Sequence, residues 1–300
     1  MVEMEFDALP NLSGLYVKAA IKRRKPPTAT TKLPDLPARA AGVIVDDLDD
    51  YLKICAIADD GHLPPTYPQV LATPLHAAIV AHADFPLPAL GMVHLENRVE
   101  QKRPIAVGEK FDLRCELSGS EWIPHLGLKF AIDTVVEVGG ETIWKSQLWA
   151  LSRGAKKDLE KRERKPRPAP EPGEVADPLV SVMVDVPADM GRRYSAVCGD
   201  YNPIHLYPLT AKLFGFKRPI VHGMWTFARC WAELANFADP EDLVFTVGFK
   251  QPLYLPTTAL ITAVEEEDGE ISYRAGSVDG QRLFLRGKAH NGALNRPTVP

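Results

Sequence analysis

The sequence has few cysteines, and none of them are spaced as metal ligands or redox pairs usually are. Four cysteines stand singly along the 300 residues, at Cys55, Cys115, Cys198 and Cys230. Structural zinc sites and redox pairs commonly place two cysteines only a few residues apart. We therefore expect reduced thiols, no disulfide framework and no metal centre.

The sequence also lacks a long hydrophobic run and a strong excess of one charge. Its longest apolar-rich stretch, residues 70–83, is interrupted by Pro74, His76 and His82 and is shorter than the roughly 20 residues that cross a bilayer. The opening MVEMEF shows no basic segment of a signal peptide. A net charge of −4 with dispersed basic residues disfavours nucleic acid as a partner. We expect a soluble, cytoplasmic protein that binds neither membranes nor nucleic acid.

A charged, proline-rich segment divides the chain. Residues 161–165 read KRERK, and prolines then occupy every second position from Pro166 to Pro172. Such a segment stays extended and solvated, so a tether is favoured over a docking site for an acidic partner. We expect an N-terminal unit over residues 1–153, a linker over 154–178 and a C-terminal unit over 179–300.

The two units share short motifs in the same order, which indicates an internal duplication. The matched pairs are 43–46 with 182–185, Tyr51-x-x-x-Cys55 with Tyr194-x-x-x-Cys198, 68–70 with 219–221, 104–107 with 252–255, and 138–141 with 278–281. The first pair is typical of a strand, the third precedes an apolar helix, and the last is a glycine-containing hairpin turn. Each unit is therefore expected to hold a strand, a short helix, a long apolar helix and several antiparallel strands.

In the C-terminal unit, apolar residues recur at a spacing of three and four, which predicts a helix with a wide buried face. These residues are Met224, Phe227, Ala228, Trp231, Leu234 and Ala235. The strand-like segments that could wrap this helix are 244–249, 259–264, 271–275 and 283–288. The pattern favours an α+β layer with an antiparallel sheet around a central helix.

The most informative segment is GDYNPIH, residues 199–205. Asp200, Asn202 and His205 place a carboxylate, an amide and an imidazole close together, and Pro203 stiffens the backbone between them. The segment predicts a rigid, exposed loop. Taken alone, Asp-x-Asn-Pro is also ordinary turn chemistry, in which the side chains cap their own backbone.

Together with Tyr194 before it and PIVHGM (219–224) after it, this segment resembles the signature of the MaoC-like (R)-specific hydratases and dehydratases. The resemblance implies an α+β double hotdog, in which two antiparallel sheets each wrap a long central helix. It also implies interconversion of trans-2-enoyl and (R)-3-hydroxyacyl thioesters of coenzyme A or acyl-carrier protein in fatty acid metabolism, with no cofactor of the enzyme's own. Residues 64–68, 85–88 and 94–97 are similar to actinobacterial 3-hydroxyacyl-thioester dehydratases, and the fold allows a homodimer of such chains.

The resemblance also implies roles for single residues. Asp200 and His205 would form the general acid–base pair, which suits a reaction that moves a weakly acidic proton and a poor leaving group. Asn202 would orient His205 or a water molecule, or would only cap the turn. The backbone N–H of Gly223, at the start of the long helix, would stabilise the enolate oxygen, unless this glycine serves packing alone. The candidate substrate-binding residues are Tyr194, His222, Met224, Lys217 and Arg218.

The duplication provides an internal comparison. When the two Tyr-x-x-x-Cys motifs are aligned, Ile57 stands opposite Asp200, Asp59 opposite Asn202, and His62 opposite His205. The N-terminal unit thus lacks the carboxylate, so we expect one site per chain and a non-catalytic N-terminal unit that binds the acyl chain. Two rival functions remain: a hotdog acyl-thioesterase, and a non-catalytic acyl-binding scaffold.

Overall fold

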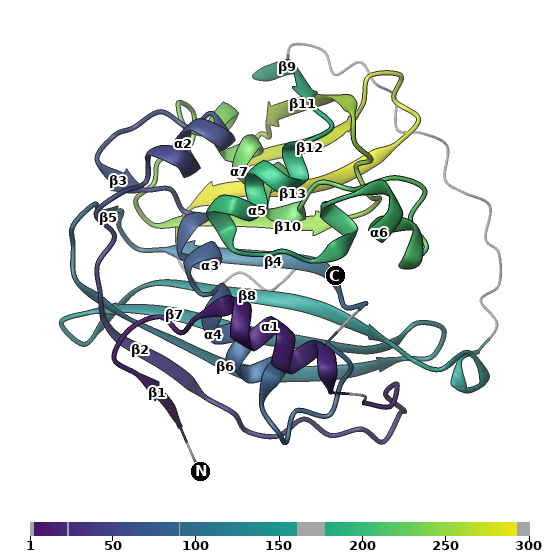
Figure 1. Cartoon of the computed structure of the whole chain (residues 1–300). Coiled ribbons are helices and arrows are strands. Elements are labelled where there is room, and N and C mark those ends of the chain that lie inside the picture. Colours follow the sequence, from purple (N-terminus) through teal and green to yellow (C-terminus); the bar gives the residue numbers. More distant parts are fainter. Residues whose placement is uncertain (1–2, 23, 90, 161–177, 293–300) are drawn as a thin grey trace.

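The structure is a computed structural model that describes residues 3–22, 24–89, 91–160 and 178–292 (Figure 1). Most of the expected linker, residues 161–177, lies outside the described residues. Its described beginning contains one turn of 3-10 helix, Lys156–Asp158. Within the described part of the chain, no helix is both long and apolar enough to span a membrane.

One large sheet of eleven strands forms the frame of the molecule, in the order β1-β2-β6-β7-β8-β4-β10-β13-β12-β11-β9. The N-terminal unit supplies β1 (Met4–Phe6), β2 (Ala38–Val43), β4 (Val93–Gln101), β6 (Phe111–Ile123), β7 (Gly127–Val138) and β8 (Glu141–Arg153). The C-terminal unit supplies β9 (Val180–Val186), β10 (Leu243–Phe249), β11 (Thr257–Glu265), β12 (Ile271–Ser277) and β13 (Leu283–Asn291). The four strand segments predicted around the long helix, the strand at 182–185 and the two hairpin turns are confirmed. The strand predicted at 43–46 is wrong for residues 44–46, because β2 ends at Val43.

The sheets of the two units meet edge to edge. β4 pairs antiparallel with β10, from Gln101 opposite Leu243 to Glu96 opposite Gly248. The sequence predicted two sheets, and this pairing joins them into one continuous surface. Figure 1 shows the helices of both units on one face of the curved sheet, as an α+β double hotdog requires.

The C-terminal unit has the expected long helix, α7 (Gly223–Leu234), whose Phe227, Ala228 and Leu234 are fully buried. Before α7 the chain forms α5 (Met190–Cys198), a turn of 3-10 helix (Pro203–His205) and α6 (Pro208–Leu213). The periodic apolar pattern therefore predicted the type and position of α7 correctly.

The long helix expected in the N-terminal unit is instead two short helices, α3 (Tyr67–Leu71) and α4 (Thr73–Ala81). Pro74 lies in the first turn of α4, where a missing N–H costs no helical hydrogen bond. A continuous helix would place this proline in its interior, so the chain starts a new helix. The same unit contains α1 (Leu12–Ile21), α2 (Asp49–Cys55) and a small ribbon of β3 (His62–Leu63) with β5 (Ile105–Ala106).

The duplicated Tyr-x-x-x-Cys motifs lie in α2 and α5, and these two helices pack against each other. The ring centroids of Tyr51 and Tyr194 are 6.3 Å apart. Arg229 of α7 donates from Nη1 to the carbonyl of Cys55 at 2.8 Å. It thereby caps the last turn of α2, where carbonyl groups lack helical partners. The C-terminal unit thus contacts the N-terminal unit through its central helix, α7.

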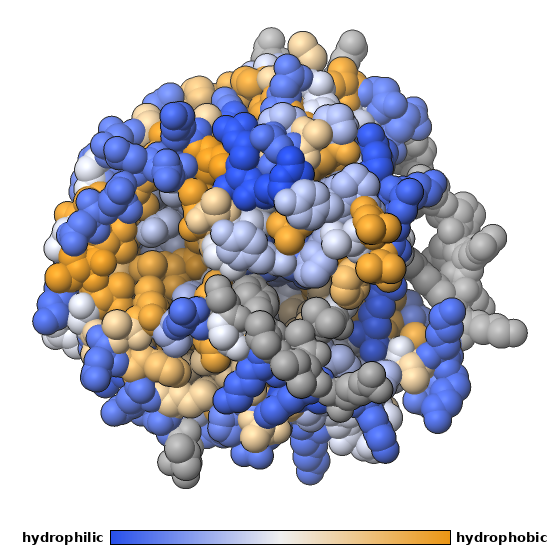
Figure 2. Space-filling model, in the orientation of Figure 1, coloured by the Kyte–Doolittle hydropathy of each residue, from blue (hydrophilic) through white to orange (hydrophobic). Residues whose placement is uncertain are grey.

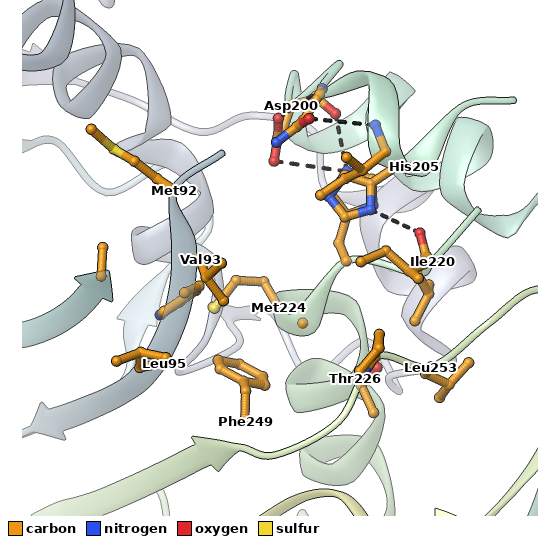
Figure 3. A pocket seen from close by; sticks show the side chains of 18 of the residues that line it. Met92, Val93, Leu95, Asp200, His205, Ile220, Met224, Thr226, Phe249 and Leu253 are labelled. Carbon is orange, nitrogen blue, oxygen red and sulfur yellow. Dashed lines mark hydrogen bonds and ion pairs between the residues drawn. The ribbon is translucent and has the colours of Figure 1, made fainter. Parts of the chain in front are cut away.

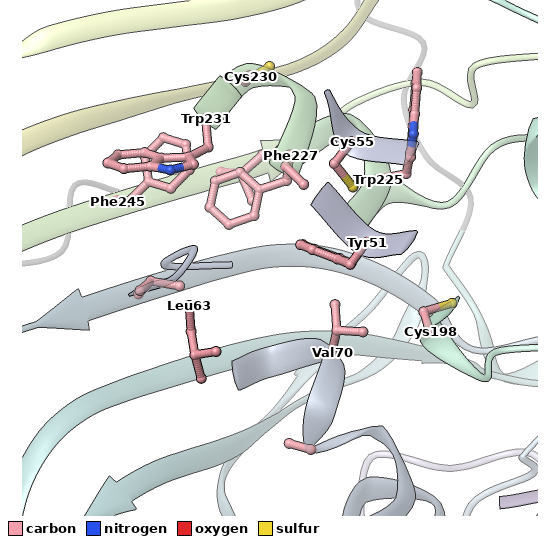
Figure 4. Packing of buried hydrophobic residues seen from close by; sticks show 14 of the residues in the cluster. Tyr51, Cys55, Leu63, Val70, Cys198, Trp225, Phe227, Cys230, Trp231 and Phe245 are labelled. Atoms are coloured by element: carbon pink, nitrogen blue, oxygen red, sulfur yellow. The ribbon is translucent and has the colours of Figure 1, made fainter. Parts of the chain in front are cut away.

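A hydrophobic core runs through both units without interruption (Figure 4). Tyr51, Leu63 and Val70 of the N-terminal unit belong to the same buried cluster as Phe227 and Phe245 of the C-terminal unit. The rings of Phe227 and Phe245 stack with centroids 4.3 Å apart. Because apolar burial is shared in this way, each unit stabilises the other.

Candidate active site

A cavity of about 780 Å³ lies between the two units, and the GDYNPIH segment forms part of its wall (Figure 3). Seven of the sequence-predicted site residues line it: Tyr194, Asp200, Asn202, His205, His222, Gly223 and Met224. A volume of this size is typical of small-molecule sites. The structure therefore brings together residues that α5, the following loop and α7 carry separately.

The loop that carries Asp200 begins where α5 ends. Gly199 has φ +71°, the left-handed conformation that commonly terminates a helix and that glycine adopts without strain. The Asp200 carboxylate then accepts a hydrogen bond from the backbone N–H of Asn202 at 3.0 Å. The Asn202 side chain in turn accepts from the N–H of Ile204 at 3.4 Å. Asn202 therefore caps the turn, one of the two roles that the sequence left open.

His205 lies on the short 3-10 turn, and its exposed fraction is only 7%. The prediction of an exposed loop is thus wrong for this residue, although Tyr201 is exposed. The cause is close packing against α5, where the His205 carbonyl lies so near Gly191 that an added Cβ would be 2.0 Å from it. Only glycine at position 191 permits that approach.

The hydrogen bonds of His205 determine its tautomer. Nδ1 lies 2.8 Å from the carbonyl oxygen of Ile220, which can only accept, so Nδ1 carries the proton. Nε2 is then a free base. Burial lowers the pKa of His205, and the Asp200 charge opposes that shift. The imidazole is therefore neutral, with Nε2 as its proton-accepting atom.

His222 connects the acid–base pair to the start of α7. Its ring stacks on that of His205 with centroids 3.6 Å apart and planes inclined by 26°. Its Nε2 donates to the backbone carbonyl of Asp200 at 3.0 Å. Burial, and then His205, lower the pKa of His222 to about 3, so the ring stays neutral. With an exposed fraction of 4%, His222 is placed to position Asp200 and His205.

Gly223 opens α7, and the first N–H groups of a helix have no partner within it. This N-terminus also carries the positive end of the helix dipole, which suits a developing oxyanion. Gly223 is packed closely as well, since an added Cβ would lie 2.8 Å from Cε1 of Phe249. Close packing against Phe249 therefore favours glycine here, and the N-terminus of α7 presents backbone donors of the kind that suit an oxyanion.

The wall of the cavity opposite His205 comes largely from the N-terminal unit. The sequence did not assign a role to the histidines of this wall. Figure 3 shows Met92, Val93 and Leu95 across the cavity from His205. His94, between them in sequence, packs on the ring of Phe249 with centroids 4.8 Å apart, and its pKa is lowered to about 4, chiefly by burial. The segment 94–97 belongs to the family resemblance, but its sequence does not place it at the cavity, because strand pairing between the units brings it there.

His76 of α4 is a further cavity residue from the N-terminal unit. Its Nε2 is 2.8 Å from the Thr134 hydroxyl, and burial lowers its pKa to about 3. Val70 and Leu148, which also line the cavity, are apolar. The N-terminal part of the cavity thus combines apolar side chains with the neutral His76, and Arg153 adds a charged group to the lining.

Two predicted binding residues stand apart from the cavity. Lys217 and Arg218 are exposed and are not among its described lining residues. Arg218 lies over the ring of Tyr254 at 5.8 Å, and Tyr254 does line the cavity. Arg218 therefore lies beside a lining residue, and Lys217 directly follows another, Phe216.

The three residues of the N-terminal unit that align in sequence with Asp200, Asn202 and His205 are placed differently from them. His62 is exposed on β3, and its Nδ1 is 3.0 Å from the carbonyl of Asp60. The Asp59 carboxylate accepts from the N–H of Gly61 at 2.9 Å, as a turn cap. Ile57 packs against the core. Among the described residues, none of these three lines the cavity.

Asp200, His205 and His222 have potential ligand atoms within 4.8 Å of one another, a spacing that a metal ion could use. Two observations argue against that use. His205 Nδ1 and His222 Nε2 both face backbone carbonyls. An ion bound to both rings would also have to lie in both ring planes, and stacked planes do not meet near their nitrogen atoms. The group fits acid–base chemistry better than metal binding.

Comparisons with known proteins agree with this geometry. Residues 168–279 match the MaoC like domain. The chain is 34% identical over 244 residues to 3-hydroxyacyl-thioester dehydratase X of Mycobacterium tuberculosis, covering 81% of this chain and 82% of the relative. The crystal structure of HtdX from that organism has a TM-score of 0.72 and 27% identity, covering 85% of this chain and 100% of that one.

A more distant relative is the peroxisomal enoyl-CoA hydratase 2 of Arabidopsis thaliana, 32% identical over 92 residues and covering 30% of each chain. The extended match to the mycobacterial dehydratase shows the family, and the likeness to HtdX confirms the α+β double hotdog. The chain belongs to the MaoC-like family of hydro-lyases.

Proposed function

We propose that this chain interconverts trans-2-enoyl and (R)-3-hydroxyacyl thioesters, carried by coenzyme A or acyl-carrier protein, in fatty acid metabolism. The observation that carries the proposal is the Asp200–His205 pair on the cavity wall, with Nε2 of His205 left as a free base by the bond from Nδ1 to Ile220. A carboxylate and a neutral imidazole this close can hold and activate one water molecule.

In the hydration direction the pair takes one proton from that water as its oxygen bonds to C3 of the enoyl group. The electrons of the C2–C3 double bond move toward the thioester carbonyl and give an enolate. A proton from the pair then returns to C2. Atoms balance because water contributes hydroxyl to C3 and hydrogen to C2. Dehydration is the same sequence reversed.

The enolate oxygen needs a preorganised donor, and we assign this role to the backbone N–H of Gly223. Support comes from its place at the N-terminus of α7 and from its position in the cavity lining. His222 stacks on His205 and donates a hydrogen bond to the Asp200 backbone carbonyl. It would therefore hold the acid–base pair at a fixed position relative to this donor. Tyr194 and Met224 complete the wall on this side.

We assign acyl-chain binding to the N-terminal unit, residues 1–153, and chemistry to the C-terminal unit, residues 179–300. Support comes from the cavity itself, which extends to Val70, Leu148 and Ala150 of the N-terminal unit. Apolar lining favours a hydrocarbon chain. The four buried, unpaired cysteines are consistent with a reducing cytoplasm.

The experiment is a hydration assay with crotonyl-CoA, decenoyl-CoA and longer enoyl thioesters, following loss of the conjugated absorbance. The chirality of the 3-hydroxyacyl product is determined in parallel. A hydro-lyase yields an (R)-3-hydroxyacyl thioester and no free thiol. Release of free coenzyme A would instead identify a thioesterase, and absence of any turnover would identify a scaffold.

A further inference from the structure

The short helix α6 presents large apolar side chains to solvent. Leu209 and Leu213, which are four residues apart and therefore share a helix face, are 73% and 78% exposed. Tyr207, directly before α6, is 54% exposed, and Tyr201, in the loop before the 3-10 turn, is 52% exposed. A single exposed leucine needs no explanation, but a group of this kind marks an interaction site. Figure 2 shows apolar (orange) atoms at the position of α6.

This surface borders the active site. The residues that follow α6, Phe214 to Phe216, line the cavity. α6 is also bonded to the catalytic turn, since Thr210 Oγ1 donates to the carbonyl of Pro203 at 2.7 Å. A molecule that covers Leu209 and Leu213 would therefore lie at the mouth of the cavity.

The same surface carries positive charge. From position 201 to position 232 the sequence contains neither aspartate nor glutamate. Lys212 stands between the two leucines in sequence, and Lys217 and Arg218 follow, all three exposed. Arg192 lies over the ring of Tyr207 at 5.1 Å. A basic rim around apolar side chains favours an acidic partner.

We propose that the α6 surface, residues 207–218, docks an acidic acyl-carrier protein that delivers the enoyl group on its phosphopantetheine arm. This inference rests on the proposed hydratase function. A coenzyme A thioester would occupy the cavity and leave Leu209 and Leu213 in water, whereas a protein carrier would bury them. A second copy of this chain is disfavoured, because a two-fold contact would place the basic patch against itself.

The test compares the same enoyl group attached to acyl-carrier protein and to coenzyme A. Leu213→Glu and Lys212→Glu should each lower kcat/KM for the carrier-protein thioester by at least tenfold and leave the coenzyme A thioester within twofold. The carrier-protein rate of the unaltered enzyme should fall with added salt. Met183→Glu is the matched control, since Met183 on β9 is 67% exposed and outside the described cavity lining.

Several outcomes would overturn the docking surface. Equal losses with both carriers would show that α6 acts on the catalytic turn. No loss with either would show that α6 binds no carrier. A dimer that Leu213→Glu dissociates would identify a second copy as the occupant, and binding to phosphatidylglycerol vesicles that the variant abolishes would identify a membrane. An enzyme that hydrates only the coenzyme A thioester overturns docking and leaves the proposed function standing, whereas one that hydrates neither overturns both.

Discussion

The proposed oxyanion role of Gly223 can be separated from its packing role by a pair of double variants. An alanine Cβ at this position would lie 2.8 Å from Cε1 and 3.0 Å from Cζ of Phe249. Overpacking of this kind costs about 1–3 kcal/mol, which exceeds or cancels the roughly 1 kcal/mol that alanine gains in a helix. Gly223→Ala alone should therefore lose stability.

Phe249→Leu removes the ring that an added Cβ would meet, so Gly223→Ala/Phe249→Leu should recover the melting temperature of Phe249→Leu. The alanine retains its backbone N–H, so activity should match that of Phe249→Leu as well. Gly223→Pro/Phe249→Leu differs by lacking the N–H. The backbone at position 223 suits proline, because this position opens α7 and the preceding His222 is extended, with φ −64° and ψ 136°.

The proline double variant should melt close to the alanine double variant and hydrate crotonyl-CoA about 10² to 10³-fold more slowly, the usual effect of losing one oxyanion donor. Melting temperature and kcat/KM are measured on the same preparations. If the proline variant is as active as the alanine variant, the N–H of Gly223 does not stabilise the enolate, and Gly223 serves packing alone.

The remaining predictions concern other parts of the cavity. Asp200→Asn and His205→Ala should each lower kcat by at least about 10²-fold, and the double variant should be little slower than either, because the two groups act as a unit; near-normal turnover of Asp200→Asn would refute the pair. His62→Ala should keep the wild-type rate, since this exposed histidine lies outside the described cavity lining; loss of all activity would instead indicate a second site. Thr73→Trp should reduce kcat/KM for decenoyl-CoA far more than for crotonyl-CoA, because Thr73 lines the N-terminal part of the cavity; equal losses would argue against acyl binding there. The unfolded chain binds a proton on His76 near pH 6.5, whereas the folded pKa is about 3, so His76 by itself should destabilise the fold by up to about 1.4 kcal/mol per pH unit as the pH falls below 6.5, and His76→Gln should show a shallower decline in urea titrations.

Local patterns in the sequence determined a large part of this protein. The period of the apolar residues in α7 and the glycine turns of the hairpins depend on neighbouring residues, so they could be predicted. The same holds for the GDYNPIH segment, because a proline and two side-chain caps define its conformation within seven residues. Pro74 was visible too, and it explains why the N-terminal helix is broken.

Tertiary structure decided what lies around that segment. His205 is buried because its carbonyl packs on Gly191 of α5, and His222 stacks on it from the start of α7. His94 reaches the cavity because β4 pairs with β10, which joins strands more than a hundred residues apart. Such contacts follow from long-range pairing and shared burial, which no local pattern encodes. The sequence therefore determined which candidate groups stand in the loop and at the start of α7, and the packing of the two units determined which of them are buried and close together.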